Sequence, residues 1–359
     1  MCTCNGIVRD YGQLDQITEF EMSHETLKKW LRDLKTKYVK YLGNGEKKSM
    51  AAFNAVKPLL CEKLNKYLNS KKRSKAGVIE PLAPRKMDLM VFFTALFECV
   101  DSGSKEDYIE LHYPQIKGSF NRYKTHCTQS RVIPELIDEL RDCKGDCIPN
   151  QFIIDSFMAK SWDGSEDTGK NPTDRGRQGI KGNIVCGPDK FVYAHQILPA
   201  NKSENECLRR LLTSGAMHFG KSVSLLADRG YSGKGIAQEC KDKQIRLICQ
   251  PKAVQPKRLK EFTCLSCKQG KGCKNGVTCV NSNARRHPND PPKMSHKLHY
   301  RDAKALRENR SYVEHVNGYL RRFRGINTKF VKKSSNYRMY VDVGIMCLNL
   351  NILFENGQL

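Results

Sequence analysis

The chain has 359 residues and carries 62 lysines and arginines against 38 aspartates and glutamates, a net charge of +24. This length allows two or three domains with a sizeable core. The first residues lack the basic start and apolar core of a signal peptide, and the longest apolar stretches, 89–100 and 341–354, are too short or too polar to span a bilayer. We therefore expect a soluble, intracellular protein whose 16 cysteines are reduced thiols or metal ligands rather than disulfides.

Residues 1–75 are predicted to form a charged helical extension, with helices over 21–41 and 50–68. The extension ends in the basic run Lys71-Lys-Arg-Ser-Lys75, which is followed closely by a glycine. Such a run indicates a solvated linker, with a nuclear import signal as the alternative.

Residues 80–148 form a second predicted helical region, with an apolar helix over 87–100 and a short helix over 105–111. A basic segment, 115–127, follows Pro114, and in it aromatic residues alternate with cations. A short helix, a turn and a basic helix are typical of a helix-turn-helix that reads the DNA major groove, although small three-helix packings look similar. The candidate DNA contacts of this segment are Lys117, Arg122 and Lys124.

From residue 151 the pattern changes to strands. We predict strands over 152–154, 179–186, 191–198, 223–227 and 245–249, and helices over 203–212 and 235–241. Ser203 and Glu206 have the spacing of a capping box at the start of the first of these helices. This order of elements predicts an α/β fold: three strands are followed by a helix, a strand, a second helix and a last strand. We expect a ribonuclease H-like mixed sheet with flanking helices over 150–355, preceded by the all-α region.

Two acidic residues follow apolar strands directly. Asp155 comes after the run 152–154, and Asp228 after the run 223–227. An acid where a buried strand emerges lies at the edge of the sheet where ligands bind, although a lone aspartate there is more often a helix cap or a turn residue. The recurrence of the pattern favours a functional role.

A third acid, Glu314, lies in a predicted helix. The apolar side chains of that helix recur at steps of three and four residues: Tyr312, Val316, Tyr319, Leu320 and Phe323. Three carboxylates, two at strand ends and one on a helix, can hold a pair of Mg²⁺ or Mn²⁺ ions for in-line attack on a phosphodiester.

The positive charge is concentrated between Pro251 and Ser335, where 21 basic residues stand against five acidic ones. Such a block predicts a polyanionic partner, and a solvated surface without a ligand is the alternative. Part of it is an apparent insertion over 252–299 that has few residues to bury. The insertion contains four cysteines that could form a zinc knuckle, a mobile loop of free thiols or disulfides: Cys264, Cys267, Cys273 and Cys279.

Several of these segments resemble those of bacterial insertion-sequence transposases of the DDE class, of the insertion-sequence four and five type. They are Asn171–Asn183, Leu198–Glu204 and Ala227–Tyr231. The Glu314 helix is similar to the Tyr/Arg/Glu/Lys signature of that class. Arg310 and Glu314 match it, Arg321 stands at the Lys position and Arg307 at the Tyr position. The resemblance covers roughly residues 80–355.

The resemblance implies a DNA transposase that binds terminal inverted repeats and catalyses metal-dependent cleavage and strand transfer, as a homodimer or larger assembly on double-stranded DNA. Asp155, Asp228 and Glu314 would form its metal-binding catalytic triad, with Mg²⁺ or Mn²⁺. Four arginines would bind phosphates near the site, or else be ordinary exposed cations: Arg310, Arg321, Arg322 and Arg324. We expect such a protein with the DNA, in the nucleoid of a bacterium or the nucleus of a eukaryote. A non-catalytic DNA-binding protein descended from a transposase is the alternative, and the presence of all three acids favours the enzyme.

Overall fold

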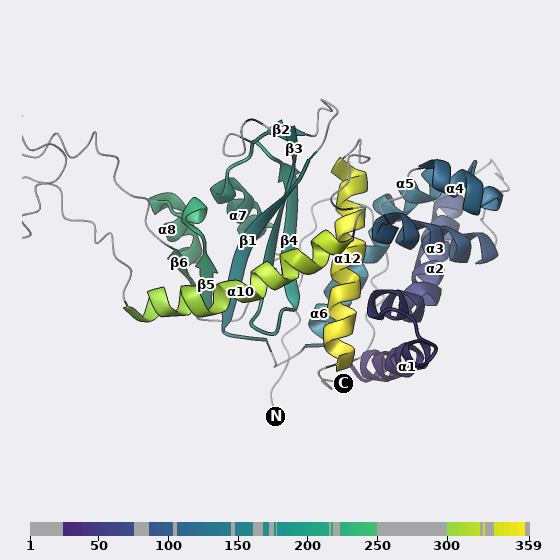
Figure 1. Cartoon of the computed structure of the whole chain (residues 1–359), viewed down its shortest axis with the longest axis horizontal. Helices are drawn as coiled ribbons and strands as arrows, with labels where there is room; N and C mark the ends of the chain where they lie inside the picture. Colours follow the sequence, from purple (N-terminus) through teal and green to yellow (C-terminus); the bar gives the residue numbers. More distant parts are fainter. Residues whose placement is uncertain are drawn as a thin grey trace, which may run out of the picture.

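The computed structural model describes residues 24–74, 86–102, 106–144, 148–160, 168–171, 178–214, 223–249, 300–323 and 334–355, together with Gly176, Met217 and Ile326. This part of the chain contains a group of amino-terminal helices, a six-stranded sheet and two long carboxyl-terminal helices (Figure 1). None of the helices described is both long and apolar enough to cross a membrane.

Every element that the structure describes in the amino-terminal region is a helix, as predicted. Its elements are α1 (His24–Gly43), α2 (Lys48–Ser74), α3 (Lys86–Ser102), α4 (Glu106–His112), the 3-10 helix η1 (Pro114–Ile116), α5 (Phe120–Ser130) and α6 (Val132–Asp142). The sequence did not predict α6 as a separate helix. Arg131 separates it from α5 and adopts the left-handed conformation, with φ at 54°. Glycine is the usual residue in this conformation, so the arginine gave no sign of a helix boundary.

The sheet contains β1 (Gln151–Lys160), β2 (Gly169–Lys170), β3 (Gln178–Cys186), β4 (Val192–Pro199), β5 (Val223–Ala227) and β6 (Ile245–Cys249). The strand order is β2-β3-β1-β5-β6, and β4 also pairs with β3. Strands β1, β3 and β4 are antiparallel, whereas β5 and β6 run parallel to β1. Helices α7 (Glu204–Thr213) and α8 (Lys234–Asp242) connect the later strands. This is the predicted ribonuclease H-like mixed sheet, and the prediction is confirmed.

Strand β1 is longer than the sequence predicted, and Asp155 lies inside it rather than at its end. The parallel pairing of β1 with β5 stops at Ile154, opposite Ala227. The antiparallel pairing with β3 continues to Lys160. Asp155 therefore lies at the point where β1 loses its partner on one side, so its surroundings are still those of a strand end.

Helices cover both faces of the sheet at this point. Successive side chains of a strand point to opposite faces. Asp155 is hydrogen-bonded to α10 (Tyr300–Arg322), and Ser156 to Glu204 of α7. Helix α10 crosses the sheet in front of β1 (Figure 1). Asp155 thus faces α10, whereas Ser156 points to the opposite face of the sheet, where α7 packs.

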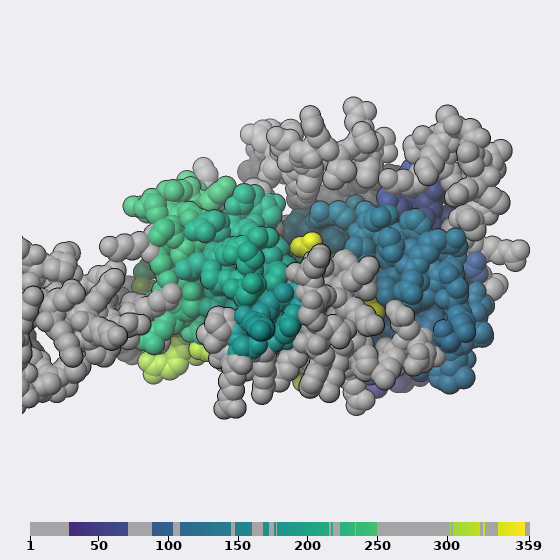
Figure 2. Space-filling model, turned by 90° about the horizontal axis from the view of Figure 1, so that it is seen from above, coloured from purple at the N-terminus to yellow at the C-terminus, as the bar shows by residue number. Residues whose placement is uncertain are grey.

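Helix α12 (Ser334–Glu355) lies between the sheet and the amino-terminal helices (Figure 1), and some of its yellow surface is visible between the teal and blue regions in Figure 2. It packs against α6, α2 and β4. Asn349, which is fully buried, accepts a hydrogen bond from the Val192 backbone N–H (2.9 Å) and donates one to its carbonyl (3.0 Å). Buried side chains from 1–75, 80–148 and 150–355 join in one core; the division into these three domains stays a prediction.

Replacing Asn349 by leucine is expected to lower the free energy of unfolding by about 3 kcal/mol, because the buried N–H and C=O of Val192 would both lose their partner. Urea unfolding followed by circular dichroism measures this. Asn351, also buried, donates one hydrogen bond, to the Tyr319 hydroxyl at 3.1 Å. Asn351→Leu should therefore cost only about 1 kcal/mol. Equal losses would show that Asn349 does not hold α12 on β4.

Candidate active site

Two of the predicted acids are neighbours: Asp155 lies in β1, and Asp228 directly follows the adjacent strand β5. Ile154 pairs with Ala227 in the parallel ladder, so the residues that follow them, Asp155 and Asp228, lie side by side. Both acids line a pocket of about 360 Å³ between the sheet and α10. The rest of its lining is Ile153, Ile154, Leu226, Ala227, Leu306, Arg307, Arg310 and Val313. The pocket therefore combines two carboxylates and two guanidinium groups over an apolar floor.

Asp228 also caps a short helix. It is the N-cap of the 3-10 helix η3 (Arg229–Tyr231), and its Oδ1 accepts a hydrogen bond from the Arg229 backbone N–H at 2.7 Å. The capping function considered for this residue is thus real. It does not use up the carboxylate, because half of the side chain (50%) remains exposed and faces the pocket.

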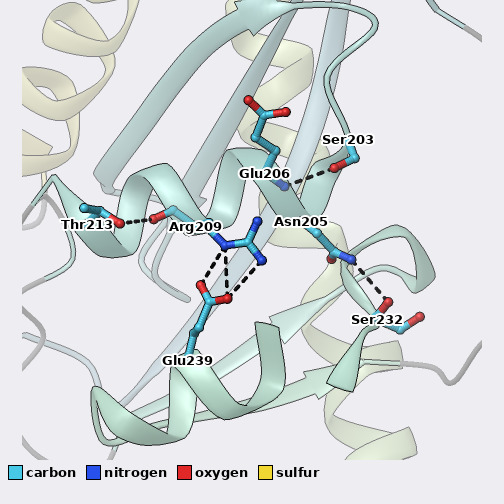
Figure 3. A network of polar contacts seen from close by, with 7 residues as sticks. All are labelled: Ser203, Asn205, Glu206, Arg209, Thr213, Ser232 and Glu239. Atoms are coloured by element: carbon cyan, nitrogen blue, oxygen red, sulfur yellow. Dashed lines mark hydrogen bonds and ion pairs between the residues drawn. The ribbon is translucent and has the colours of Figure 1, made fainter. Parts of the chain in front are cut away.

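The turn after Asp228 is fixed by contacts from behind the sheet. The buried Tyr231 hydroxyl donates to Asn183 Oδ1 of β3 at 2.8 Å. Asn205 of α7 donates to the Ser232 carbonyl at 3.4 Å (Figure 3). Gly230 lies so close to Glu204 that a Cβ atom there would overlap the Glu204 Oε2. The backbone that carries Asp228 is therefore held by β3 and by the first turn of α7.

The first turn of α7 is itself well fixed. Ser203 caps the helix and accepts a hydrogen bond from the Glu206 backbone N–H at 3.1 Å (Figure 3), which is one of the two bonds of the predicted capping box. The Glu206 carboxylate accepts from Arg210 at 2.8 Å instead. Arg209 Nε and Nη2 donate to the Glu239 carboxylate of α8 at 2.9 to 3.0 Å (Figure 3). A bidentate pair of this kind fixes the geometry between two helices. The two helices that flank the Asp228 turn are thus joined to each other.

Asp155 lies in a less polar environment than Asp228. Burial raises the pKa of its carboxyl group, and the charges of Asp228 and Glu204 act in the same direction. The Ser156 backbone N–H and the Arg310 guanidinium oppose the rise. Asn317 Nδ2 of α10 also donates to Asp155 Oδ2, at 3.1 Å. A carboxylate that is poorly solvated and has a second one beside it is a group that a cation would stabilise.

Glu314 reaches this site through Arg310. Arg310 Nε donates to Glu314 Oε1 at 3.0 Å, and its Nη1 lies 3.9 Å from Asp228 Oδ1. In the part of the chain that the structure describes, no three His, Cys, Asp or Glu side chains are grouped closely enough to hold a metal ion. The structure therefore brings Asp155 and Asp228 together and links Glu314 to them by an arginine, rather than gathering all three carboxylates.

The donor set nevertheless fits a hard divalent cation. Carboxylate oxygens are the ligands that Mg²⁺ and Mn²⁺ prefer. The Arg310 and Glu314 side chains are 57% and 59% exposed, and an exposed pair one helical turn apart contributes only about 0.3–0.5 kcal/mol. A divalent ion on Asp155 and Asp228 can therefore compete with Arg310 for Glu314 at little cost.

The remaining predicted arginines lie along or beyond α10. Arg321 and Arg322 are exposed in its last turn, about 16 Å along the helix axis from Arg310. Arg324 lies outside the described residues. So do the four cysteines of the predicted zinc site, Cys264, Cys267, Cys273 and Cys279. No disulfide joins the cysteines of the described ranges.

The predicted DNA contacts of the amino-terminal region divide into exposed and buried residues. Arg122 is exposed on α5, and Lys117 is exposed but forms an ion pair with Glu110 at 2.8 Å. Lys124 is only 6% exposed, and its ammonium group lies 5.7 Å from the centre of the Phe120 ring. In this conformation Lys124 packs inside the helical region and does not present its charge on the surface.

Two residues near the acids were not among the predicted site residues, namely Arg307 and Asn317. Arg307 lines the pocket one turn before Arg310. Asn317 is buried in the stripe of α10 that contacts the sheet, next to Val316 and Leu320. The available signal for Asn317 was a polar residue in an otherwise apolar helical stripe.

Two comparisons with known proteins found a match. The family model of the transposase DDE domain matches residues 148–350. Among solved structures, the chain is similar to the piggyBac transposase in a cryo-EM synaptic complex with hairpin DNA, with 11% identity and a TM-score of 0.47, over 83% of this chain and 75% of that chain. No curated protein matches the sequence.

Gly230→Ala should lower the free energy of unfolding by about 1 kcal/mol, because the added methyl group overlaps the Glu204 carboxylate and must displace it. In a chain that already carries Glu204→Ala, the same substitution should cost less than half as much, since the obstacle is gone. Urea unfolding of the two single variants and the double variant measures this coupling. Additive costs would show that Glu204 does not restrict the turn after Asp228.

Proposed function

The chain belongs to the family of transposases that share the DDE domain, and from this premise we propose that it cuts and rejoins DNA at the ends of a mobile element. The observation that carries the proposal is the parallel register of β1 and β5, which places Asp155 and Asp228 side by side in a pocket that also contains arginines. Acidic and basic side chains together suit a phosphodiester whose reaction requires divalent cations.

The reaction is an in-line displacement at phosphorus. In the first step water attacks the phosphodiester at the element's end, the bond to the 3′ oxygen breaks, and a free 3′-OH remains. In strand transfer this 3′-OH attacks a target phosphodiester in the same way. Bound Mg²⁺ or Mn²⁺ ions supply the positive charge that both the attacking and the leaving oxygen need.

The residues of the chain have distinct tasks in this proposal. Asp155 and Asp228 would hold the cations, and Glu314, which is ion-paired with Arg310, would be a further carboxylate ligand. Arg310 can then turn its guanidinium to the non-bridging phosphate oxygens, for which its planar donors are suited. Arg307, at the wall of the same pocket, binds a neighbouring phosphate.

The DNA would extend from the pocket along the basic side chains. Arg321 and Arg322 continue the row on α10, and Arg122 and Lys117 offer further charges on the amino-terminal helices. Phosphate contacts of this kind supply affinity without sequence preference. Since both ends of an element must be handled together, we propose a homodimer or larger assembly on DNA, acting in the nucleoid or nucleus.

A second candidate function is a DNA-binding protein without catalysis. It is favoured by the ion pair between Arg310 and Glu314 and by the lack of a gathered three-acid cluster among the described residues. The two functions differ in whether the chain binds divalent cations and cuts DNA. Incubation of the pure chain with a labelled duplex from the ends of its own element, in Mg²⁺ and in chelator, distinguishes them.

Asp228→Asn is expected to reduce strand cleavage by at least about 1,000-fold, because a neutral amide binds divalent cations far more weakly than the carboxylate on which the displacement depends. Binding of the end duplex, measured by fluorescence anisotropy in chelator, should change by less than about twofold, since Asp228 adds no attraction for phosphate.

Asp302→Asn is the matched control. Asp302 is an acid in the first turn of α10, and it forms an ion pair with Arg246 at 2.8 Å rather than facing the pocket. Its variant should cleave like the parent chain. If Asp228→Asn lost binding and cleavage in equal measure, a purely catalytic role of Asp228 would be wrong.

Arg307→Ala should weaken binding of the end duplex about tenfold and reduce the slope of log affinity against log salt by about one, because one phosphate contact is lost. No ion pair or hydrogen bond engages the Arg307 side chain within the ranges that the structure covers, so its charge is available. Lys304→Ala is the control. Lys304 lies one turn earlier on α10 and pairs with Glu308 at 3.7 Å. An unchanged salt slope for Arg307→Ala would remove Arg307 from the DNA interface.

A further inference from the structure

Asn317 occupies an unusual place on α10. It lies one turn beyond Glu314 and two turns beyond Arg310, and it is only 4% exposed. Its neighbours in the buried stripe of the helix are apolar, Val316 and Leu320 among them. Burying an amide among apolar side chains is unfavourable unless its polar atoms are hydrogen-bonded. A packing role alone would be served better by leucine.

The amide of Asn317 is satisfied on one side only. Nδ2 donates to Asp155 Oδ2 at 3.1 Å, whereas Oδ1 is buried and has no hydrogen-bond partner among the described residues. The charge of Asp155 dictates this orientation, because an ionised carboxylate can only accept. The flipped amide would set two acceptors against each other. The Asn317 amide thus donates to Asp155, while its own oxygen gains no hydrogen bond from the described residues.

The same hydrogen bond connects two parts of the site that are far apart in the chain. Asp155 belongs to β1, and α10 begins 145 residues later. Positions 310, 314 and 317 lie on one side of α10, since they are separated by one and two helical turns. A bond from Asn317 to the sheet therefore also determines which residues α10 turns toward the strand ends.

We propose that Asn317 is a positioning residue of the active site. Its amide orients the Asp155 carboxylate for cation binding, and the same bond sets the rotation of α10 that directs Arg310 and Glu314 to the pocket. This inference rests on the proposed function, because it assigns Asn317 to the same cation site. Side chains that hydrogen-bond a metal ligand typically change metal affinity by about 10- to 100-fold when they are removed.

The test compares Asn317→Leu and Asn317→Ala with the full-length parent chain. Both variants remove the donor, and the smaller one guards against misfolding through an overfilled site. Mn²⁺ binding is measured by electron paramagnetic resonance without DNA, and binding of the end duplex by anisotropy in chelator. In both variants the dissociation constant for Mn²⁺ should rise about tenfold. DNA affinity in chelator should stay unchanged, and cleavage should need about tenfold more Mg²⁺.

Asn351→Leu is the matched control. Asn351 is likewise a buried asparagine that donates to a side-chain oxygen, the Tyr319 hydroxyl, and its Oδ1 has no hydrogen-bond partner in the part of the chain that the structure describes. It lies on α12, and its variant should leave Mn²⁺ binding unchanged. Similar loss of Mn²⁺ binding in Asn317→Leu and Asn351→Leu would reduce Asn317 to a structural residue and overturn the inference.

The remaining outcomes separate this inference from the proposed function. If the parent chain binds Mn²⁺ and cleaves DNA while both Asn317 variants behave like it, only the assignment of Asn317 is wrong. If the parent chain neither binds Mn²⁺ nor cleaves its end duplex, the cation site itself is absent, and the proposed function falls together with the role of Asn317.

Discussion

The parallel pairing of β1 with β5 is the constraint on which the site depends. Asp155 and Asp228 are 73 positions apart in the sequence and become neighbours only because Ile154 stands opposite Ala227. A shift of one residue in this register would turn one acid to the opposite face of the sheet. The buried apolar residues before each acid oppose such a shift, since it would expose them. The hydrophobic core thus sets the distance between two charged groups at its edge.

The stretches that resemble transposases are also the ones that support Asp228 from behind. The turn Asp228–Ser232 rests on the start of α7, where Glu204 leaves room for a glycine only and Asn205 holds a backbone carbonyl. Tyr231 ties the same turn to β3. A capped α7 joined to α8 gives this support its rigidity. The described residues of these motifs therefore contribute to the position of the backbone that carries the acid.

The sequence predicted the elements whose information is local. The strand before Asp228, the Ser203 cap and the strand over 245–249 follow from apolar runs, turns and spacing, and the structure has them at those positions. Features that depend on residues far away in the chain could not be predicted from the sequence. Asp155 lies within a strand because β3 pairs further than β5 does, and Asn317 finds its acceptor 162 residues earlier. Lys124 alternates with aromatic residues as a DNA-contacting lysine would, yet it is buried by neighbouring helices.

Charge balance connects these observations. Two carboxylates at a poorly solvated strand end repel each other, and the pKa of Asp155 is raised by burial and by Asp228. Arg310 offsets part of this cost and at the same time forms an ion pair with Glu314. In the proposed mechanism a divalent cation would replace Arg310 as the positive charge beside the two aspartates. Arg310 would then be available to bind a phosphate of the DNA. In the proposed mechanism cation and DNA binding favour each other, because a cation on the carboxylates frees Arg310 for a phosphate, and a phosphate on Arg310 frees the carboxylates for the cation. A site of this kind is less stable when empty than an apolar one would be, as active sites commonly are.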